Sequence, residues 1–125
     1  MPIITCIDDL KQLCRRKIPK MFYDYVETGS WSESTFKNNT RDLGLIKFNQ
    51  RVGVDISDIT TEDTMLGSKV SMPMALAPIG LTGMQSADGE IKAARAAKKM
   101  GIPFILSTMS VCSIEDVAKE AGEGF

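Results

Sequence analysis

Histidine is absent from the 125 residues of this chain. It is the only side chain whose unperturbed pKa places its charge change near neutral pH, so a mechanism that needs such a base must find it elsewhere. Long apolar runs are also missing, because no stretch approaches the roughly 20 residues that span a bilayer. The N-terminus lacks the basic region and long apolar core of a secretory signal. These absences predict a cytoplasmic location.

Cysteine and net charge are low as well. The three cysteines are odd in number and have no metal-ligand spacing, which indicates reduced thiols and no metal site. The formal net charge is −1, with acidic and basic residues interleaved, and this pattern predicts no nucleic-acid surface. Hydrophobic residues make up 43% and charged residues 25%, the balance of an ordinary globular protein.

Two consecutive strand–turn–helix patterns begin at residues 72–80 and 101–110. Each is a short apolar run that stops at small or turn-forming residues, and each is followed by helical periodicity. Strands over about 74–77 and 103–106 contain almost no polar residue, which suits strands buried on both faces of a parallel sheet. The sequence therefore predicts an α/β fold whose ligands lie at the carboxyl ends of these strands.

The segment ahead of these strands predicts helices and a hairpin. Ile7, Leu10, Leu13 and Cys14 recur at helical spacing behind a capping box at Thr5–Asp8. Pro19 suits the start of a second helix that Gly29 ends, with Met21, Phe22, Tyr25 and Val26 on one apolar face. Ser30–Glu33 predicts a further capping box, opening a polar helix through about Arg41.

Three further patterns complete the expected elements. Residues 51–57 alternate with period two, which predicts a strand or extended segment with Val52, Val54 and Ile56 facing inward. Residues 64–70 predict a hairpin that turns at Gly67-Ser68. The helix after Ser86–Glu90 has acids in its first turn, which suit the helix dipole, and Gly101 ends it. Ser113–Asp116 caps a final helix.

Four segments carry a family resemblance: Ile18-Pro-Lys-Met-Phe-Tyr-Asp-Tyr25, residues 75–84 (Ala-Leu-Ala-Pro-Ile-Gly-Leu-Thr-Gly-Met), residues 88–97, and residues 106–117. In order and spacing they resemble the FMN-dependent α-hydroxy acid dehydrogenases, most of all the L-lactate and mandelate dehydrogenases. The resemblance covers essentially the whole chain. It implies the N-terminal part of a TIM (β/α)8 barrel, with residues 1–70 as pre-barrel helices and hairpin and 71–125 as the first two βα units and the approach to the third strand.

The resemblance implies FMN as cofactor and an L-α-hydroxy acid as substrate, L-lactate above all, which is oxidised to the 2-keto acid. Electrons would pass to a quinone or cytochrome. The family's histidine base, its arginines and a lysine near the flavin lie on later strands, so we expect a fragment that is inactive alone. The resemblance also implies a homo-oligomer, and a downstream segment could hold the full-length enzyme on the inner face of the plasma membrane.

Tyr25 is the residue that the resemblance assigns to the substrate, because it matches a tyrosine that hydrogen-bonds the substrate carboxylate. Its apolar ring would anchor the hydroxyl in a fixed place. Spacing alone favours a different interpretation, a buried core aromatic. Tyr23 is expected to be structural, and no residue of this chain is assigned as catalytic.

Pro78, Ile79, Gly80 and Ser107 are the residues that the resemblance assigns to FMN. By themselves, Pro78 and Gly80 are ordinary turn residues and Ser107 is an ordinary strand-terminal residue. In the family the backbone here holds the flavin ring, and Gly80 allows close approach because it has no Cβ. A glycine at this position favours the dehydrogenase branch over the oxidases. Met109 matches a variable position near the substrate.

Two alternatives are open from the sequence. One is another flavin or phosphate-binding TIM-barrel enzyme, which would not be expected to share the Tyr23-Asp24-Tyr25 segment. The other is a non-catalytic truncated remnant that acts only as a binding module or not at all.

Overall fold

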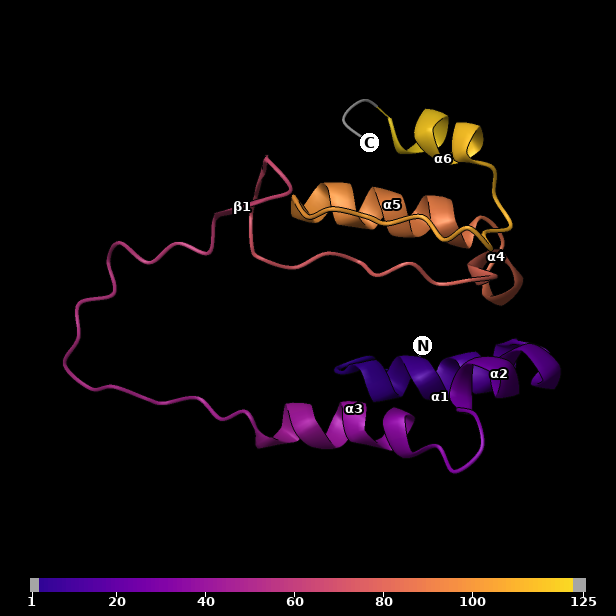
Figure 1. The fold of residues 1–125 in the computed structure, drawn as a ribbon, viewed down its shortest axis with the longest axis horizontal. Helices are drawn as coiled ribbons and strands as arrows, with labels where there is room; N and C mark the ends of the chain where they lie inside the picture. The colour runs from indigo at the N-terminus through magenta and orange to yellow at the C-terminus, as the bar shows by residue number, and fades with distance from the viewer. Residues whose placement is uncertain (1–2, 123–125) are drawn as a thin grey trace. The chain divides into compact units, whose positions relative to one another are not determined.

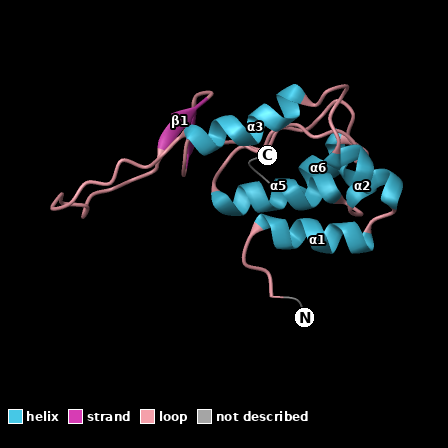
Figure 2. Ribbon diagram, turned by 90° about the horizontal axis from the view of Figure 1, so that it is seen from below, coloured by secondary structure: helices cyan, strands magenta, loops and turns pink. Residues whose placement is uncertain are grey.

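The computed structural model describes residues 3–122 and divides into two compact units, Met1–Asp55 and Ile56–Phe125. The first unit contains α1 (Ile7–Lys17), α2 (Lys20–Glu27) and α3 (Ser34–Leu45). The second contains β1 (Asp63–Met65), β2 (Ser68–Val70), α4 (Thr82–Gln85), α5 (Gly89–Met100) and α6 (Ile114–Ala121) (Figure 1). Helices make up most of the regular structure, and strands among the described residues are confined to the hairpin (Figure 2).

Helices α1 and α2 begin close to where the sequence predicts them. The carboxylate of Asp9, one residue after the predicted Asp8, accepts hydrogen bonds from the Thr5 N–H at 2.8 Å and the Thr5 hydroxyl at 2.9 Å. Pro19 precedes α2 at its N-cap, and an ion pair between Lys11 and Glu27 joins the two helices. Because an acidic side chain at the N-terminus and opposite charges across a helix pair are both favourable, this corner is stabilised locally.

The start of α3 differs from the prediction. The helix begins at Ser34 and continues to Leu45, and the expected capping box at Ser30 is wrong. Trp31 and Glu33 adopt positive φ angles of 54° and 57°, which no helix accommodates. The Glu33 carboxylate instead accepts a hydrogen bond from the Gly29 N–H at 3.2 Å.

The prediction for residues 51–57 is also wrong. The segment forms no strand, and Val52, Val54 and Ile56 are 98%, 57% and 69% exposed. Alternation buries one face of a segment only where a second layer covers that face, and none of the described residues covers this one.

The hairpin is confirmed, with its turn displaced by one residue. β1 and β2 pair antiparallel, with Asp63 opposite Val70 and Met65 opposite Ser68. Leu66 and Gly67 form the turn and both have positive φ, 51° and 80°. A two-residue hairpin turn of this kind needs positive φ at both central positions, and glycine adopts it without cost.

The two predicted buried strands run side by side in the predicted parallel direction, but they are shorter than expected. Their ladder is one bridge, between Leu76 and Phe104. The Leu76 N–H donates to the Pro103 carbonyl at 2.9 Å, and the Ile105 N–H donates to the Leu76 carbonyl at 3.1 Å. Prolines at 73, 78 and 103 have no N–H, which limits how far such a ladder extends. Neither strand is buried on both faces among the described residues.

The core of the second unit lies between α5 and α6. Ile91, Ala94, Val117 and Ala121 are buried there, and Phe104, Leu106 and Cys112 pack against them. The small alanines let the helices approach closely. The helix ends follow the predicted signals, because Gly101 closes α5 with a φ of 66° and the Ser113 hydroxyl accepts the Asp116 N–H at 3.0 Å.

Candidate functional site

The carboxyl ends of the two parallel segments meet at Gly80 and Ser107. The Leu81 N–H donates to the Met109 carbonyl at 2.9 Å, so the two loops are joined directly beyond the strand bridge. A Cβ placed on Gly80 would lie 3.3 Å from the Met109 Cβ and 3.9 Å from the Ser107 Oγ. The structure therefore brings Gly80, Ser107 and Met109 together at one edge.

Ser107 is held in a turn that directs its hydroxyl to this edge. Its Oγ accepts the Met109 N–H at 3.1 Å, and its carbonyl accepts the Ser110 N–H at 3.1 Å. The described residues provide no acceptor for the O–H of Ser107. A serine hydroxyl can donate and accept at once, so this group remains able to donate to a bound molecule.

Pro78 and Ile79 are exposed ahead of Gly80, and Ile79 is 60% exposed. The Ile79 carbonyl accepts the Thr82 hydroxyl at 3.0 Å. Neither the Ile79 nor the Gly80 N–H donates to another backbone group among residues 3–122. The edge therefore presents backbone donors beside a position without a Cβ, which is the surface that a flat, polar-edged ring system needs.

Tyr25 lies on α2 in the first unit, whereas the other predicted site residues lie in the second. It is 63% exposed, so it is not a core aromatic among the described residues. Tyr23 is half-buried, and burial first, then the adjacent Glu27 carboxylate, raises the pKa of its phenol. The two tyrosines thus differ in environment, because Tyr25 is mostly exposed whereas Tyr23 is half-buried.

Glu90 is the residue that the sequence analysis missed. It was assigned to the helix dipole, yet its side chain is 1% exposed, and it is the one buried charged side chain among residues 3–122. The signal was its spacing, because Glu90, Ala94 and Ala97 follow the i, i+4, i+7 pattern of one buried helix face. A charged residue in such a position needs partners.

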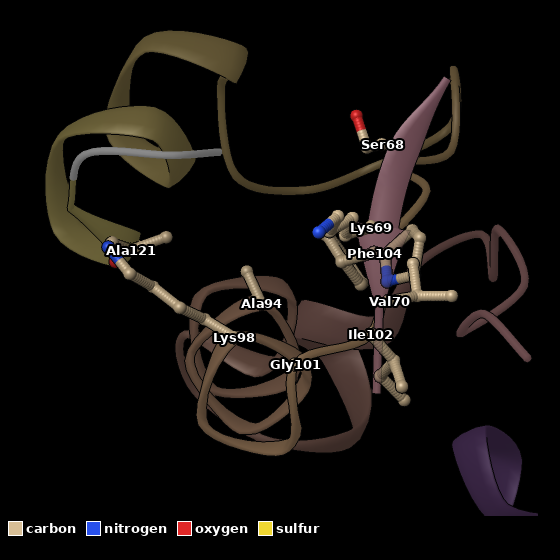
Figure 3. A pocket seen from close by; sticks show the side chains of 10 residues that line it. Ser68, Lys69, Val70, Ala94, Lys98, Gly101, Ile102, Phe104 and Ala121 are labelled. Atoms are coloured by element: carbon tan, nitrogen blue, oxygen red, sulfur yellow. The ribbon is translucent and has the colours of Figure 1, made fainter. Parts of the chain in front are cut away.

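A hollow of about 400 Å³ lies in the second unit (Figure 3). It is lined by β2, by α5 and α6, and by residues 101–104, which begin the second parallel segment. In Figure 3 the Lys98 side chain extends toward Ala121, whose carbonyl accepts its ammonium at 3.2 Å. None of the predicted site residues lines this hollow, so it is separate from the candidate site.

Two kinds of feature are absent from the described residues. Residues 3–122 contain no cluster of three or more acidic, cysteine or histidine side chains that could hold a metal ion. No helix within the same range is both long and apolar enough to cross a membrane.

Comparison with known proteins places this geometry in a family. The profile described as FMN-dependent dehydrogenase matches residues 14–125. The chain belongs to this family. It is 47% identical over 116 residues to an L-lactate dehydrogenase of Vibrio parahaemolyticus, and 43% identical over 117 residues to one of a Caulobacter species. These matches cover 93% and 94% of the chain.

Solved structures in the same family have the same fold over this range. A soluble mutant of the membrane-associated (S)-mandelate dehydrogenase from Pseudomonas putida matches with a TM-score of 0.82 and 39% identity, over 91% of the chain and 33% of that structure. A mandelate oxidase matches with a TM-score of 0.86 and 30% identity, over 94% of the chain and 34% of that structure. The chain spans about a third of the length of the two L-lactate dehydrogenases, 31% in each case.

Proposed function

We propose that a full-length protein carrying this chain oxidises a small L-α-hydroxy acid, L-lactate in particular, to the corresponding 2-keto acid with FMN as its cofactor. The observation that carries the proposal is the meeting of Gly80 and Ser107 at the carboxyl ends of two parallel segments, in a chain of the FMN-dependent dehydrogenase family. Parallel α/β folds bind their ligands at this end of the strands.

Pro78, Ile79, Gly80 and Ser107 would hold FMN through backbone groups and one hydroxyl. The Ile79 and Gly80 N–H groups donate to no other backbone group among the described residues, and Gly80 presents no Cβ, so both donors and space are available. When bound, FMN supplies the two-electron acceptor that no side chain can provide. Pro78, Ile79, Gly80 and Ser107 would orient it.

We assign the two parallel segments to the first two strands of a (β/α)8 barrel, preceded by residues 1–70. The parallel bridge at Leu76 and Phe104, with α5 leading from one segment to the next, supports this assignment. A parallel pair joined by a helix is the repeating unit of such barrels.

Tyr25 would orient the substrate by donating its hydroxyl to the carboxylate of the hydroxy acid. Its exposure on α2 leaves the hydroxyl accessible, which a core aromatic would not allow. L-lactate is favoured over mandelate because an L-lactate dehydrogenase of Vibrio parahaemolyticus is 47% identical to the chain, against 39% for the mandelate dehydrogenase structure. A quinone or cytochrome acceptor, peripheral membrane association and a homo-oligomer complete the proposal.

The proposal is tested by mixing the full-length protein, loaded with FMN, with hydroxy acids in the absence of oxygen. We expect L-lactate to bleach the flavin absorbance with a higher kcat/KM than (S)-mandelate or glycolate, and a soluble quinone analogue to restore it faster than oxygen does. A higher kcat/KM with (S)-mandelate than with L-lactate would show that mandelate, and not lactate, is the preferred substrate. No reduction by any hydroxy acid would refute the proposed activity.

Ser107→Ala in the same protein is expected to raise the dissociation constant of FMN about 5-fold. The variant removes one neutral hydrogen bond to FMN, worth about 1 kcal/mol, together with the bond that the Ser107 Oγ accepts from the Met109 N–H within the turn. Titration of the FMN-free protein, followed by flavin fluorescence, measures the effect. Ser68→Ala, on the hairpin, is the matched control and should leave the affinity unchanged. Equal FMN affinities of Ser107→Ala and the parent protein would show that Ser107 is an ordinary turn residue that does not contact the flavin.

A further inference from the structure

Glu90 joins the two loops that follow the parallel segments. One carboxylate oxygen, Oε1, accepts the Gly83 N–H at 3.0 Å and the Val111 N–H at 3.0 Å. Gly83 lies in the first turn of α4, where N–H groups have no carbonyl of their own helix to bond. Val111 lies in the loop between Ser107 and α6. A single buried oxygen therefore satisfies one backbone donor from each loop.

The packing around this carboxylate leaves no room for adjustment. A Cβ on Gly83 would lie 2.7 Å from the Val111 Cβ and 3.0 Å from the Glu90 Oε2. A Cβ on Gly89 would lie 2.6 Å from the Thr82 carbonyl oxygen. The 2.7 Å and 2.6 Å separations are too short for a real side chain, so two glycines let the loops close around Glu90. The contact between the two loops and the carboxylate therefore depends on Gly83, Gly89 and Glu90 together.

The carboxylate is held in its charged form. Burial raises the pKa of Glu90, but the backbone N–H groups of Val111, of Glu90 itself and of Gly83, with the Cys112 thiol, lower it by more, so its pKa lies below the ordinary value. Burial and then the nearby Glu90 carboxylate raise the pKa of the Cys112 thiol. Oε2 itself has no hydrogen bond of ordinary geometry among the described residues. Oε1 therefore makes both backbone contacts, and charge strengthens each of them.

We propose that Glu90 is a positioning residue for the flavin site: its carboxylate sets the separation of the loops after the two parallel segments, and so the separation of Gly80 from Ser107. Gly80 is three residues before Gly83, and Ser107 is four residues before Val111. Each backbone N–H that Glu90 binds therefore lies within four residues of a proposed flavin contact. The direct bond between Leu81 and Met109 joins the same loops nearer the edge. The identity of the bound group, FMN, rests on the proposed function, whereas the contact of Glu90 with both loops does not.

The test compares Glu90→Asp and Glu90→Gln in the full-length protein. Asp keeps the charge but is one methylene shorter, so it cannot reach both N–H groups. Gln keeps the reach and a carbonyl acceptor but loses the charge. We expect Glu90→Asp to raise amide hydrogen exchange at Gly83 and Val111 at least 10-fold, and to raise the FMN dissociation constant at least 10-fold. Glu90→Gln should show a clearly smaller change in both quantities. Glu115→Gln, an exposed acid on α6, is the control and should change neither.

Exchange is measured on the FMN-free protein, so it tests the loop contact even if FMN does not bind, in which case only the proposed function fails. Faster exchange at Gly83 and Val111, with Ala94 and Ala97 of α5 still protected, supports positioning. Faster exchange across all of α5 would overturn the proposal, since it would show a general loss of structure. Unchanged exchange, or a larger effect of Gln than of Asp, would overturn it as well.

Discussion

The 125-residue chain alone, mixed with excess FMN, L-lactate and an artificial electron acceptor, is expected to show no turnover above background. The chain contains no histidine, and the resemblance to α-hydroxy acid dehydrogenases assigns the general base to a histidine. General bases of this kind contribute about 10²- to 10⁴-fold to the rate. The measurement is reduction of the artificial acceptor, followed by absorbance over a range of protein concentrations.

The full-length protein assayed under the same conditions is the control, and it should turn over. Reproducible reduction by the chain alone, in proportion to its concentration, would show that the residues of this chain suffice for catalysis. It would also remove the reason for assigning the base to a residue outside the sequence.

Tyr25→Phe in the full-length protein is expected to lower kcat/KM for L-lactate about 10- to 150-fold. The ring is kept, so the packing of α2 changes little, while one hydrogen bond to a charged carboxylate is lost. Such a bond is worth roughly 1.5–3 kcal/mol, which gives this range if it persists in the transition state. Steady-state kinetics measures the loss, and flavin absorbance should show an unchanged FMN content.

Tyr23→Phe is the matched control, two residues away on the same helix. Its hydroxyl lies beside the Glu27 carboxylate, and Tyr23 is half-buried, so we expect at most a small change in melting temperature and no change in kcat/KM. If Tyr25→Phe instead left the kinetics unaltered and lowered the melting temperature strongly, Tyr25 would be a packing residue in the full-length protein.

The helix ends show what local chemistry could predict. Gly101 closes α5 in the left-handed conformation, and Ser113 caps α6 through the Asp116 N–H, both as expected. Each of these features depends on groups within four residues of one another, so their energies are set before any tertiary contact forms. The hairpin turn is equally local, because Met65 pairs with Ser68 three residues later, and it was displaced by only one residue.

The predictions that failed depended on a partner that the local pattern does not specify. Residues 51–57 alternate, but Val52 is 98% exposed, because alternation states which side chains share a face and not what covers it. The Ser30 box failed because the Glu33 carboxylate accepts the Gly29 N–H, four residues away, instead of the Ser30 N–H, three residues away. Propensity could not choose between the two.

At the candidate site, the sequence by itself determined the order of the elements, the family, and that Gly80 and Ser107 end successive apolar segments. Only the tertiary structure decided that these residues meet, because the parallel contact between Leu76 and Phe104 joins segments 28 positions apart. It also decided that Glu90 is buried and bonded to both loops. A carboxylate in the first turn of a helix interacts favourably with the helix dipole whether it faces water or two backbone N–H groups. The helical pattern therefore does not decide between the two environments, and packing selects one of them.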